Sequence, residues 1–161
     1  MNVIEPHKFQ SLTVWHLENP AMPRKVGTVS LAPGMQRLSF RYAAEWIDEG
    51  FDLSPDMQRF NREKPNTSDI LAPHDKIAPG ALDDAMPDRW GQTIIRVVDN
   101  PPRLTPLDFL FLAGDRRFGC LGMSIEPNAY VPYPLPALPK KESLAAAAEL
   151  IEKILSKQPV D

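Results

Sequence analysis

Charged side chains with a potential for chemistry gather at two places in the chain. Asp83, Asp84 and Asp88 lie close together and could form an acid–base set, because neighbouring carboxylates can hold and transfer a proton. Arg116 and Arg117 are adjacent and could pair with a carboxylate or phosphate of a partner. Each place also has a purely structural interpretation. Acidic residues stabilise the positive end of a helix dipole, and two arginines fit a solvated hairpin turn.

Metal and nucleotide sites have no clear signature in the sequence. His7, His16 and His74 are scattered, and none lies at metal-ligand spacing from another histidine or from Cys120. We interpret His16 as a partly exposed strand residue and Cys120 as a small, buried apolar residue. The glycines of residues 118–122 lie within a strand pattern, so they do not form a phosphate-binding loop. We therefore expect no metal and no cofactor.

The size and charge of the chain limit its function classes. Its 161 residues predict one domain of ordinary composition, and its net charge of −3 argues against a general nucleic-acid binder. One cysteine allows no intrachain disulfide, which suits a reducing compartment. No apolar run reaches the roughly 18 residues of a membrane span. We expect a cytoplasmic chain with no direct nucleic-acid or membrane partner.

The first half of the chain predicts an antiparallel meander. Apolar alternation indicates strands over residues 12–17, 25–31 and 36–42, joined by short turns. A short helix over 43–49 follows, and Gly50 ends it. We expect residues 51–54 to return to the sheet and residues 56–79 to form a long surface loop.

A central helix is predicted around the stretch 83–98. Pro87 suits its first turn, and Trp90, Ile94, Val97 and Val98 fall on one apolar face. We expect the sheet to pack on this helix. Trp90 is then a core residue, and the alternative is that it forms part of a binding surface.

The later elements complete the predicted fold. Thr105 and Pro106 predict the start of a helix that ends at Gly114, and residues 118–125 predict a strand. Residues 142–155 form an amphipathic pattern. The fold class is therefore α+β, a small antiparallel sheet or partly closed barrel with two to four helices packed on it. We divide the chain into a subdomain over 1–126, a proline-rich connector over 127–141 and a C-terminal helical segment over 142–161.

Five stretches in register resemble the N-terminal part of HipA-like serine/threonine kinases, the toxins of bacterial toxin–antitoxin modules. The stretches are Val26-Gly27-Thr28-Val29-Ser30-Leu31; Leu38-Ser39-Phe40-Arg41-Tyr42 with Glu45-Trp46; Leu82-Asp83-Asp84-Ala85-Met86-Pro87-Asp88-Arg89-Trp90-Gly91; Leu104-Thr105-Pro106-Leu107-Asp108-Phe109-Leu110; and Gly114-Asp115-Arg116-Arg117-Phe118-Gly119-Cys120-Leu121-Gly122. The resemblance covers residues 11–157 and implies the first N-terminal subdomain, a small sheet or barrel with helices packed on it.

The resemblance implies that catalysis needs segments further along the family's chain. These are a glycine-rich phosphate segment with a phosphorylatable serine, a nucleotide-anchoring lysine, and catalytic and metal-binding aspartates. Because this chain contains none of them, we expect it not to be an enzyme by itself. The implied partner is a HipA-like kinase core, in cis or in trans, and a HipB-like DNA-binding antitoxin is a further candidate.

Three functions are compatible with the sequence. The chain is a regulatory subdomain from a longer kinase, a separately encoded small subunit that binds and restrains a kinase, or an unrelated small enzyme that uses Asp88 and His74. The helix at 142–157 favours the first slightly over the second. In that helix the apolar stripe either docks onto a partner or folds back onto its own sheet. The candidate interaction residues are Trp90, Asp88, Arg89, Arg116, Arg117, Ile151 and Leu155.

Overall fold

The computed structural model describes residues 9–34, 36–96, 105–113, 120–133, 152–153 and 156. These residues form a five-stranded antiparallel sheet, a small two-stranded hairpin and four short helices. The strands of the large sheet lie in the order β6-β3-β2-β1-β7. The elements are β1 (Ser11–His16), β2 (Arg24–Leu31), β3 (Leu38–Tyr42), α1 (Ala44–Glu49), β4 (Phe60–Asn61), β5 (Lys64–Pro65), β6 (Ile70–Leu71), α2 (Gly80–Ala85), α3 (Arg89–Ile94), α4 (Pro106–Leu112) and β7 (Leu121–Ser124).

The core face of the sheet follows from alternation along the strands. Leu12 lies opposite Val29, and Val29 lies opposite Phe40, so one apolar row crosses β1, β2 and β3. All three side chains are buried. Directly opposed residues in antiparallel strands share a face, and their side chains therefore pack against each other. The predicted meander is confirmed, and the sheet is open rather than closed into a barrel.

One close approach in the sheet requires glycine. A Cβ atom on Gly27 would lie 2.2 Å from the backbone oxygen of Arg41 and 2.6 Å from the ring of Phe40. Since no Cβ tolerates such distances, Gly27 lets β2 and β3 approach beneath the Phe40 ring.

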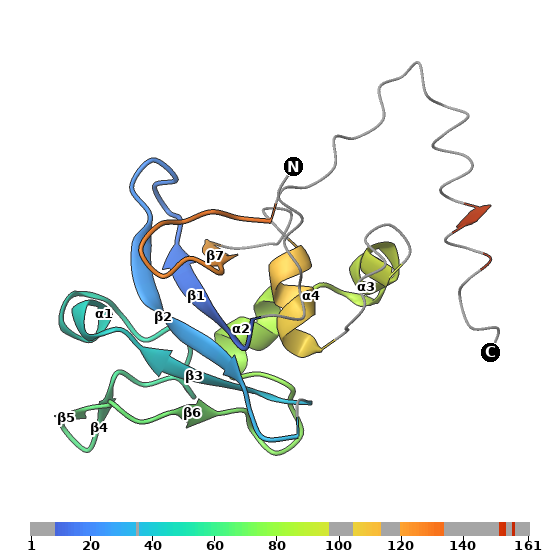
Figure 1. Cartoon of the computed structure of the whole chain (residues 1–161). Helices are drawn as coiled ribbons and strands as arrows, with labels where there is room; N and C mark the ends of the chain where they lie inside the picture. Colours follow the sequence, from blue (N-terminus) through green and yellow to red (C-terminus); the bar gives the residue numbers. More distant parts are fainter. Residues whose placement is uncertain are drawn as a thin grey trace.

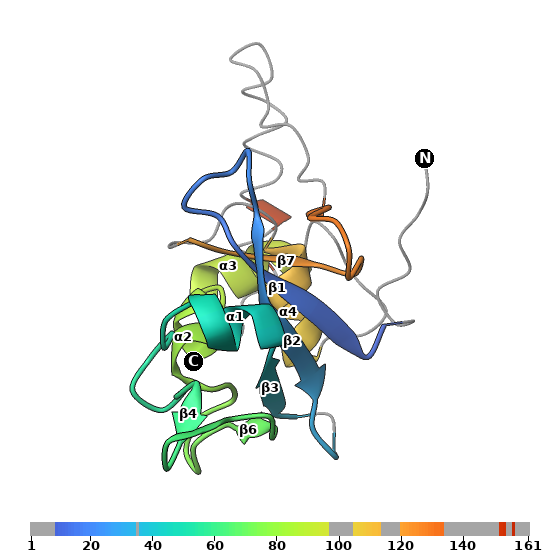
Figure 2. The same cartoon turned by 90° about the vertical axis from the view of Figure 1, so that its left-hand side faces the viewer.

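Helix α4 is the helix that packs on the centre of the sheet. It contacts β1, β2 and β7, and its Leu107, Leu110 and Phe111 side chains are almost fully buried. Figures 1 and 2 show α2, α3 and α4 gathered beside one another, with the β4–β5 hairpin at the other end of the molecule from α3. The expectation that the stretch 83–98 forms the packing helix is therefore wrong, because α4 has that role.

The predicted central helix is divided into two short helices. Helix α2 ends at Ala85, and Met86 is extended, with φ −64° and ψ 142°. The residue before a proline avoids the helical region, so Pro87 ends α2 instead of starting one continuous helix. Asp83 consequently belongs to the first turn of α2, and Asp88 is the N-cap of α3. Residues 97–98, half of the predicted apolar face, lie outside the described residues.

Other sequence predictions had mixed outcomes. The helices predicted at 43–49 and 105–113 are confirmed as α1 and α4. Residues 51–54 are in no strand, and the predicted loop over 56–79 contains β4, β5 and β6. The strand predicted over 118–125 is observed as the shorter β7. Almost all of the predicted C-terminal helix lies outside the described residues.

The helices that the structure describes are short. None of them combines the length and the apolar character that crossing a bilayer requires.

Candidate functional site

The start of α3 is an exposed but well-fixed turn. The Asp88 carboxylate accepts a hydrogen bond from the Gly91 backbone N–H at 2.7 Å. The Gln92 side-chain amide donates to the carbonyl oxygen of Pro87 at 3.0 Å, and the Thr93 hydroxyl donates to that of Arg89 at 3.0 Å. The Asp88 bond satisfies one of the backbone N–H groups that a helix start otherwise leaves free, and the other two bonds tie side chains of α3 to the backbone of this turn. The turn is therefore held in shape although its outer side faces solvent.

Exposed charged side chains lie at both ends of α3. Asp88 and Arg89 are both exposed and adjacent, so the turn presents one negative and one positive group. The exposed Arg96 lies with its guanidinium 5.5 Å from the ring centre of Phe109 and so connects the end of α3 to α4. Ile95, the residue before Arg96, is buried. The arrangement can recognise a partner surface that carries both charges.

The structure brings only some of the predicted site residues together. Asp88 and Arg89 share the α3 start, and the backbone of Trp90 continues α3, but the Trp90 side chain lies outside what the structure describes. The remaining candidates fall wholly outside the described residues; they are Arg116, Arg117, Ile151 and Leu155.

The acid–base interpretation receives no support from the described residues. Asp83 lies 3.8 Å from the Lys76 ammonium in a partly exposed ion pair, and Asp84 is exposed on α2. His74 is also exposed. Within the described ranges, no three His, Cys, Asp or Glu side chains are placed to hold a metal ion.

Two side chains have the opposite exposure to the one predicted. His16 is buried, because its ring lies 5.4 Å from those of both Trp46 and Phe51. The adjacent Trp46 donates its indole N–H to the carbonyl oxygen of Phe51 at 2.9 Å. Cys120 is exposed, since it precedes β7 instead of lying within a longer strand.

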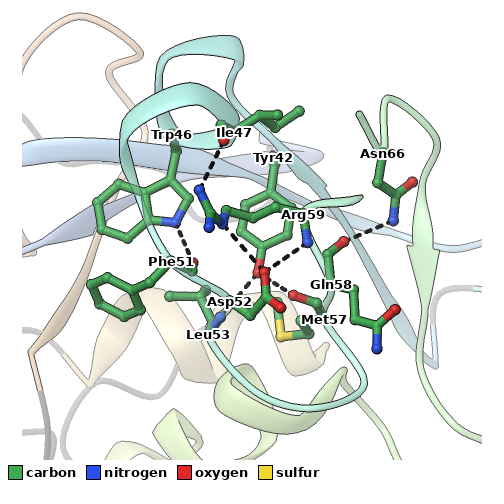
Figure 3. A network of polar contacts seen from close by, with 10 residues as sticks. All are labelled: Tyr42, Trp46, Ile47, Phe51, Asp52, Leu53, Met57, Gln58, Arg59 and Asn66. Carbon is green, nitrogen blue, oxygen red and sulfur yellow. Dashed lines mark hydrogen bonds and ion pairs between the residues drawn. The ribbon is translucent and has the colours of Figure 1, made fainter. Parts of the chain in front are cut away.

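A second fixed region holds the loop that follows α1 (Figure 3). The Tyr42 hydroxyl donates to the carbonyl oxygen of Met57 and accepts from the Leu53 N–H at 3.1 Å. Burial raises the pKa of Tyr42 to about 12, although the bond from Leu53 lowers it somewhat. Arg59 donates to the carbonyl oxygen of Ile47 at 2.9 Å and pairs with Asp52 at 3.2 Å.

Sequence reasoning missed this network because its members lie in a stretch without periodicity. No local pattern relates Tyr42 to Met57 or Arg59 to Ile47; only the folded chain brings them together. The sequence does contain a local pattern for another buried polar contact, at the start of α4. Thr105 and Asp108 have the spacing of a capping box, and the structure forms it in full.

Comparison with known proteins gives one match. The family described as the HipA N-terminal domain matches residues 21–124, which run from the β1–β2 turn to the last residue of β7. That range is well over half of the chain. No curated protein and no solved structure matches significantly.

Proposed function

The chain belongs to the HipA N-terminal domain family, and on that premise we propose that it is a non-catalytic interaction module that docks onto the kinase core of a HipA-like serine/threonine kinase. The family match carries the proposal, because it covers the large sheet from β2 onward together with all four helices. Such a module acts in the cytoplasm, where the kinase acts. The kinase core is supplied in cis, by a longer chain, or in trans, by a second one.

The α3 start is the docking surface that the described residues favour. It combines exposed charge with a fixed backbone, so a partner that binds it has little ordering entropy to overcome. Asp88 and Arg89 are also exposed at the start of α3 and are not among the core residues, so contacts there do not compete with packing. We propose that Asp88 and Arg89 pair with opposite charges on the kinase core, and that Arg116 and Arg117 also contact that core.

A role in trans has one observation in its favour. The buried cluster joins side chains of β1, β2, β3, α1, α2, α4 and β7, so this core is closed by the chain's own residues. A domain that closes its own core can fold separately and then bind and restrain a shorter kinase. A HipB-like DNA-binding antitoxin would be a further partner of either form.

The proposal that the chain is no enzyme is tested by nucleotide titration. We expect no heat of binding when Mg-ATP is titrated into the purified chain, because a kinase holds the nucleotide with a glycine-rich loop, a lysine and metal-binding carboxylates. A one-site isotherm would contradict this proposal and revive the alternative of an independent enzyme.

Docking itself is tested by calorimetry with a HipA-like kinase core expressed without this domain. We expect one-to-one binding, and we expect kinase autophosphorylation to change when the chain is added. A fall in phosphorylation would identify a restraining subunit, and a rise would identify a supporting subdomain. Absence of binding to cores from several such kinases would contradict docking.

The C-terminal segment has its own test. We propose that Ile151 and Leu155 contact the kinase core, so changing both to Asp should abolish binding and leave the melting temperature of the isolated chain unchanged. A strongly lowered melting temperature would mean that these side chains belong to the chain's own core.

A further inference from the structure

A polar hollow of about 460 Å³ lies between the β4–β5 hairpin, the preceding loop and strand β6. Figure 1 shows these three elements side by side at one end of the sheet. Side chains with hydrogen-bonding or charged groups form most of the lining, and they include Asp56, Gln58, Asn61, Asn66, Ser68 and Asp69. Nothing in the proposed role of the α3 start uses this hollow.

The walls of the hollow are fixed by hydrogen bonds. The Asn66 side-chain amide donates to the carbonyl oxygen of Gln58 at 3.0 Å, and the Asn66 backbone N–H donates to that of Arg59 at 2.7 Å. Figure 3 shows Asn66 and Gln58 beside the network that anchors Arg59 to Asp52 and to Ile47. The hollow is therefore formed in the free chain and does not depend on a ligand to shape it.

The hairpin that forms one wall contains an unusual turn. Arg62 and Glu63 both have positive φ, 51° and 67°, where two-residue hairpins ordinarily place Asn and Gly. The pairs Phe60 with Pro65 and Asn61 with Lys64 hold this turn in place. A left-handed backbone at two residues with long side chains costs stability, and residues held in such conformations are found most often at active sites and ligand-binding segments.

The charges of the lining favour a cationic guest. Two carboxylates, Asp56 and Asp69, line the hollow, and none of its lining residues is a lysine or an arginine. Partial burial opposes ionisation of Asp56, but hydrogen bonds from the Ser54 hydroxyl and the Gly80 N–H outweigh it and lower the pKa of the carboxyl. The carboxylate is therefore charged at neutral pH. Asp69 pairs with Arg41 at 2.9 Å, and because both side chains of this pair are exposed, a competing cation can replace Arg41.

The neighbouring strand favours a protein as the source of that cation. Strand β6 pairs with β3 on one side and is the last strand of the large sheet as far as the structure describes it. An edge strand offers backbone groups to an extended segment, and side-chain amides such as those of Gln58 and Asn61 can both donate to and accept from a peptide backbone. The lining contains no aromatic ring for stacking a sugar, and its negative charge repels phosphate.

We infer that the hollow beside β6 binds an extended segment of a partner protein that carries a lysine or arginine side chain. The cationic group lies between Asp56 and Asp69, and the amides of Gln58 and Asn61 bond to the backbone of the segment. This binding is independent of docking through the α3 start, so either can fail without the other.

The test uses the whole chain labelled with ¹⁵N and a capped six-residue peptide in which Thr and Lys alternate. We expect saturable shifts of the amide signals of Gln58, Asn61, Asn66 and Asp69 that weaken with added salt. The same peptide with Glu in place of Lys should cause none. Shifts confined to other residues would overturn the inference. So would a Kd weaker than about 1 mM, seen as a failure to saturate up to that peptide concentration.

Three variants distinguish charge recognition from a change of fold. Asp69→Lys should weaken binding by about tenfold, because it places a like charge in the hollow. Arg41→Gln should strengthen binding by about twofold, because it releases Asp69 from its exposed ion pair. Glu18→Lys, in the β1–β2 turn, makes the same change of net charge as Asp69→Lys outside the hollow and should have no effect. Equal weakening by Glu18→Lys and Asp69→Lys, or weakening by Arg41→Gln, would contradict the assignment.

Discussion

The helices α3 and α4 begin with similar chemistry in opposite surroundings. Each has a polar N-cap side chain that accepts a hydrogen bond from the backbone three residues later, and each has a proline beside the cap. The α4 cap is buried, with Asp108 fully shielded from solvent and Thr105 nearly so. The α3 cap, Asp88, is exposed. The local sequence therefore determines where both helices start. Burial then makes the start of α4 part of the fold and leaves the start of α3 accessible to a partner.

The two helix starts have similar hydrogen-bond geometry, but losing these hydrogen bonds should cost more stability in α4 than in α3. In α4 the Asp108 carboxylate accepts from both the backbone N–H and the hydroxyl of Thr105, each at 2.7 Å, and both residues are shielded from bulk solvent. In α3 the loss of the Asp88 bond would be repaired by solvent. A buried polar group that loses its partner costs much more than an exposed one.

Asp108→Ala is the strongest test of this comparison. We expect a loss of about 3 kcal/mol in the free energy of unfolding, because the Asp108 half of the capping box is removed and two buried donors of Thr105 lose this acceptor. Urea denaturation measures the loss. A loss equal to that of Asp88→Ala would mean that burial does not separate the two helix starts.

Tyr42→Phe extends the comparison to the buried loop network. We expect a loss of about 1–2 kcal/mol, because the N–H of Leu53 and the carbonyl of Met57 lose their shared partner. The pKa of Tyr42 is raised in the folded chain to about 12, above the usual 10. Its stabilising contribution is therefore complete below pH 10 and is lost as the pH rises through about 12.

The free energy of unfolding of Tyr42→Phe should lack this decrease at alkaline pH. Any pH dependence that remains in the variant then comes from other titrating groups. Thermal denaturation measured at steps from pH 8 to about pH 12 would compare the two chains. Parallel curves for wild type and Tyr42→Phe would show that the hydroxyl is not buried in the way the structure describes.

Asp88→Ala should have a smaller effect than either buried change. We expect a loss of about 1 kcal/mol, the usual effect of removing an exposed helix cap. Denaturation under the conditions used for Asp108→Ala gives a matched measurement. A loss as large as that of the buried cap would place the α3 start within the cooperative core and weaken its role as a docking surface.

Trp90 determines whether α3 belongs to the core or to the interface. A core role predicts that Trp90→Ala costs about 3–5 kcal/mol, a large share of the stability of a domain. The docking role of α3 predicts instead near-native melting with loss of binding to the kinase core. Melting and binding measured on the same variant distinguish the two roles.

The sheet could be predicted from sequence because its signal is local. Leu38, Phe40 and Tyr42 alternate with polar residues, and this period alone specifies a strand with one buried face. Thr105 followed by Pro106 specified the start of α4 in the same way. These patterns need no knowledge of distant contacts, so the meander and the α4 helix were both predicted.

The candidate site was harder to predict because its features depend on context. Pro87 is compatible both with a helix start and with a helix end, and the extended Met86 shows that it ended α2. The Arg62–Glu63 turn has none of the usual hairpin residues, so β4 and β5 were read as loop. His16 is buried only because Trp46 and Phe51 come from other elements to cover it.

The central claim is that the chain docks onto a kinase core through the α3 start, and Arg89→Glu tests it most directly. The change reverses an exposed charge, so the free energy of unfolding should stay within about 0.5 kcal/mol of wild type. The affinity for the kinase core should fall by about tenfold. Lys25→Glu, on β2, makes the same change of net charge on a different element and should leave the affinity unchanged. Equal affinities for wild type and Arg89→Glu, measured by calorimetry with both variants folded, would contradict the claim.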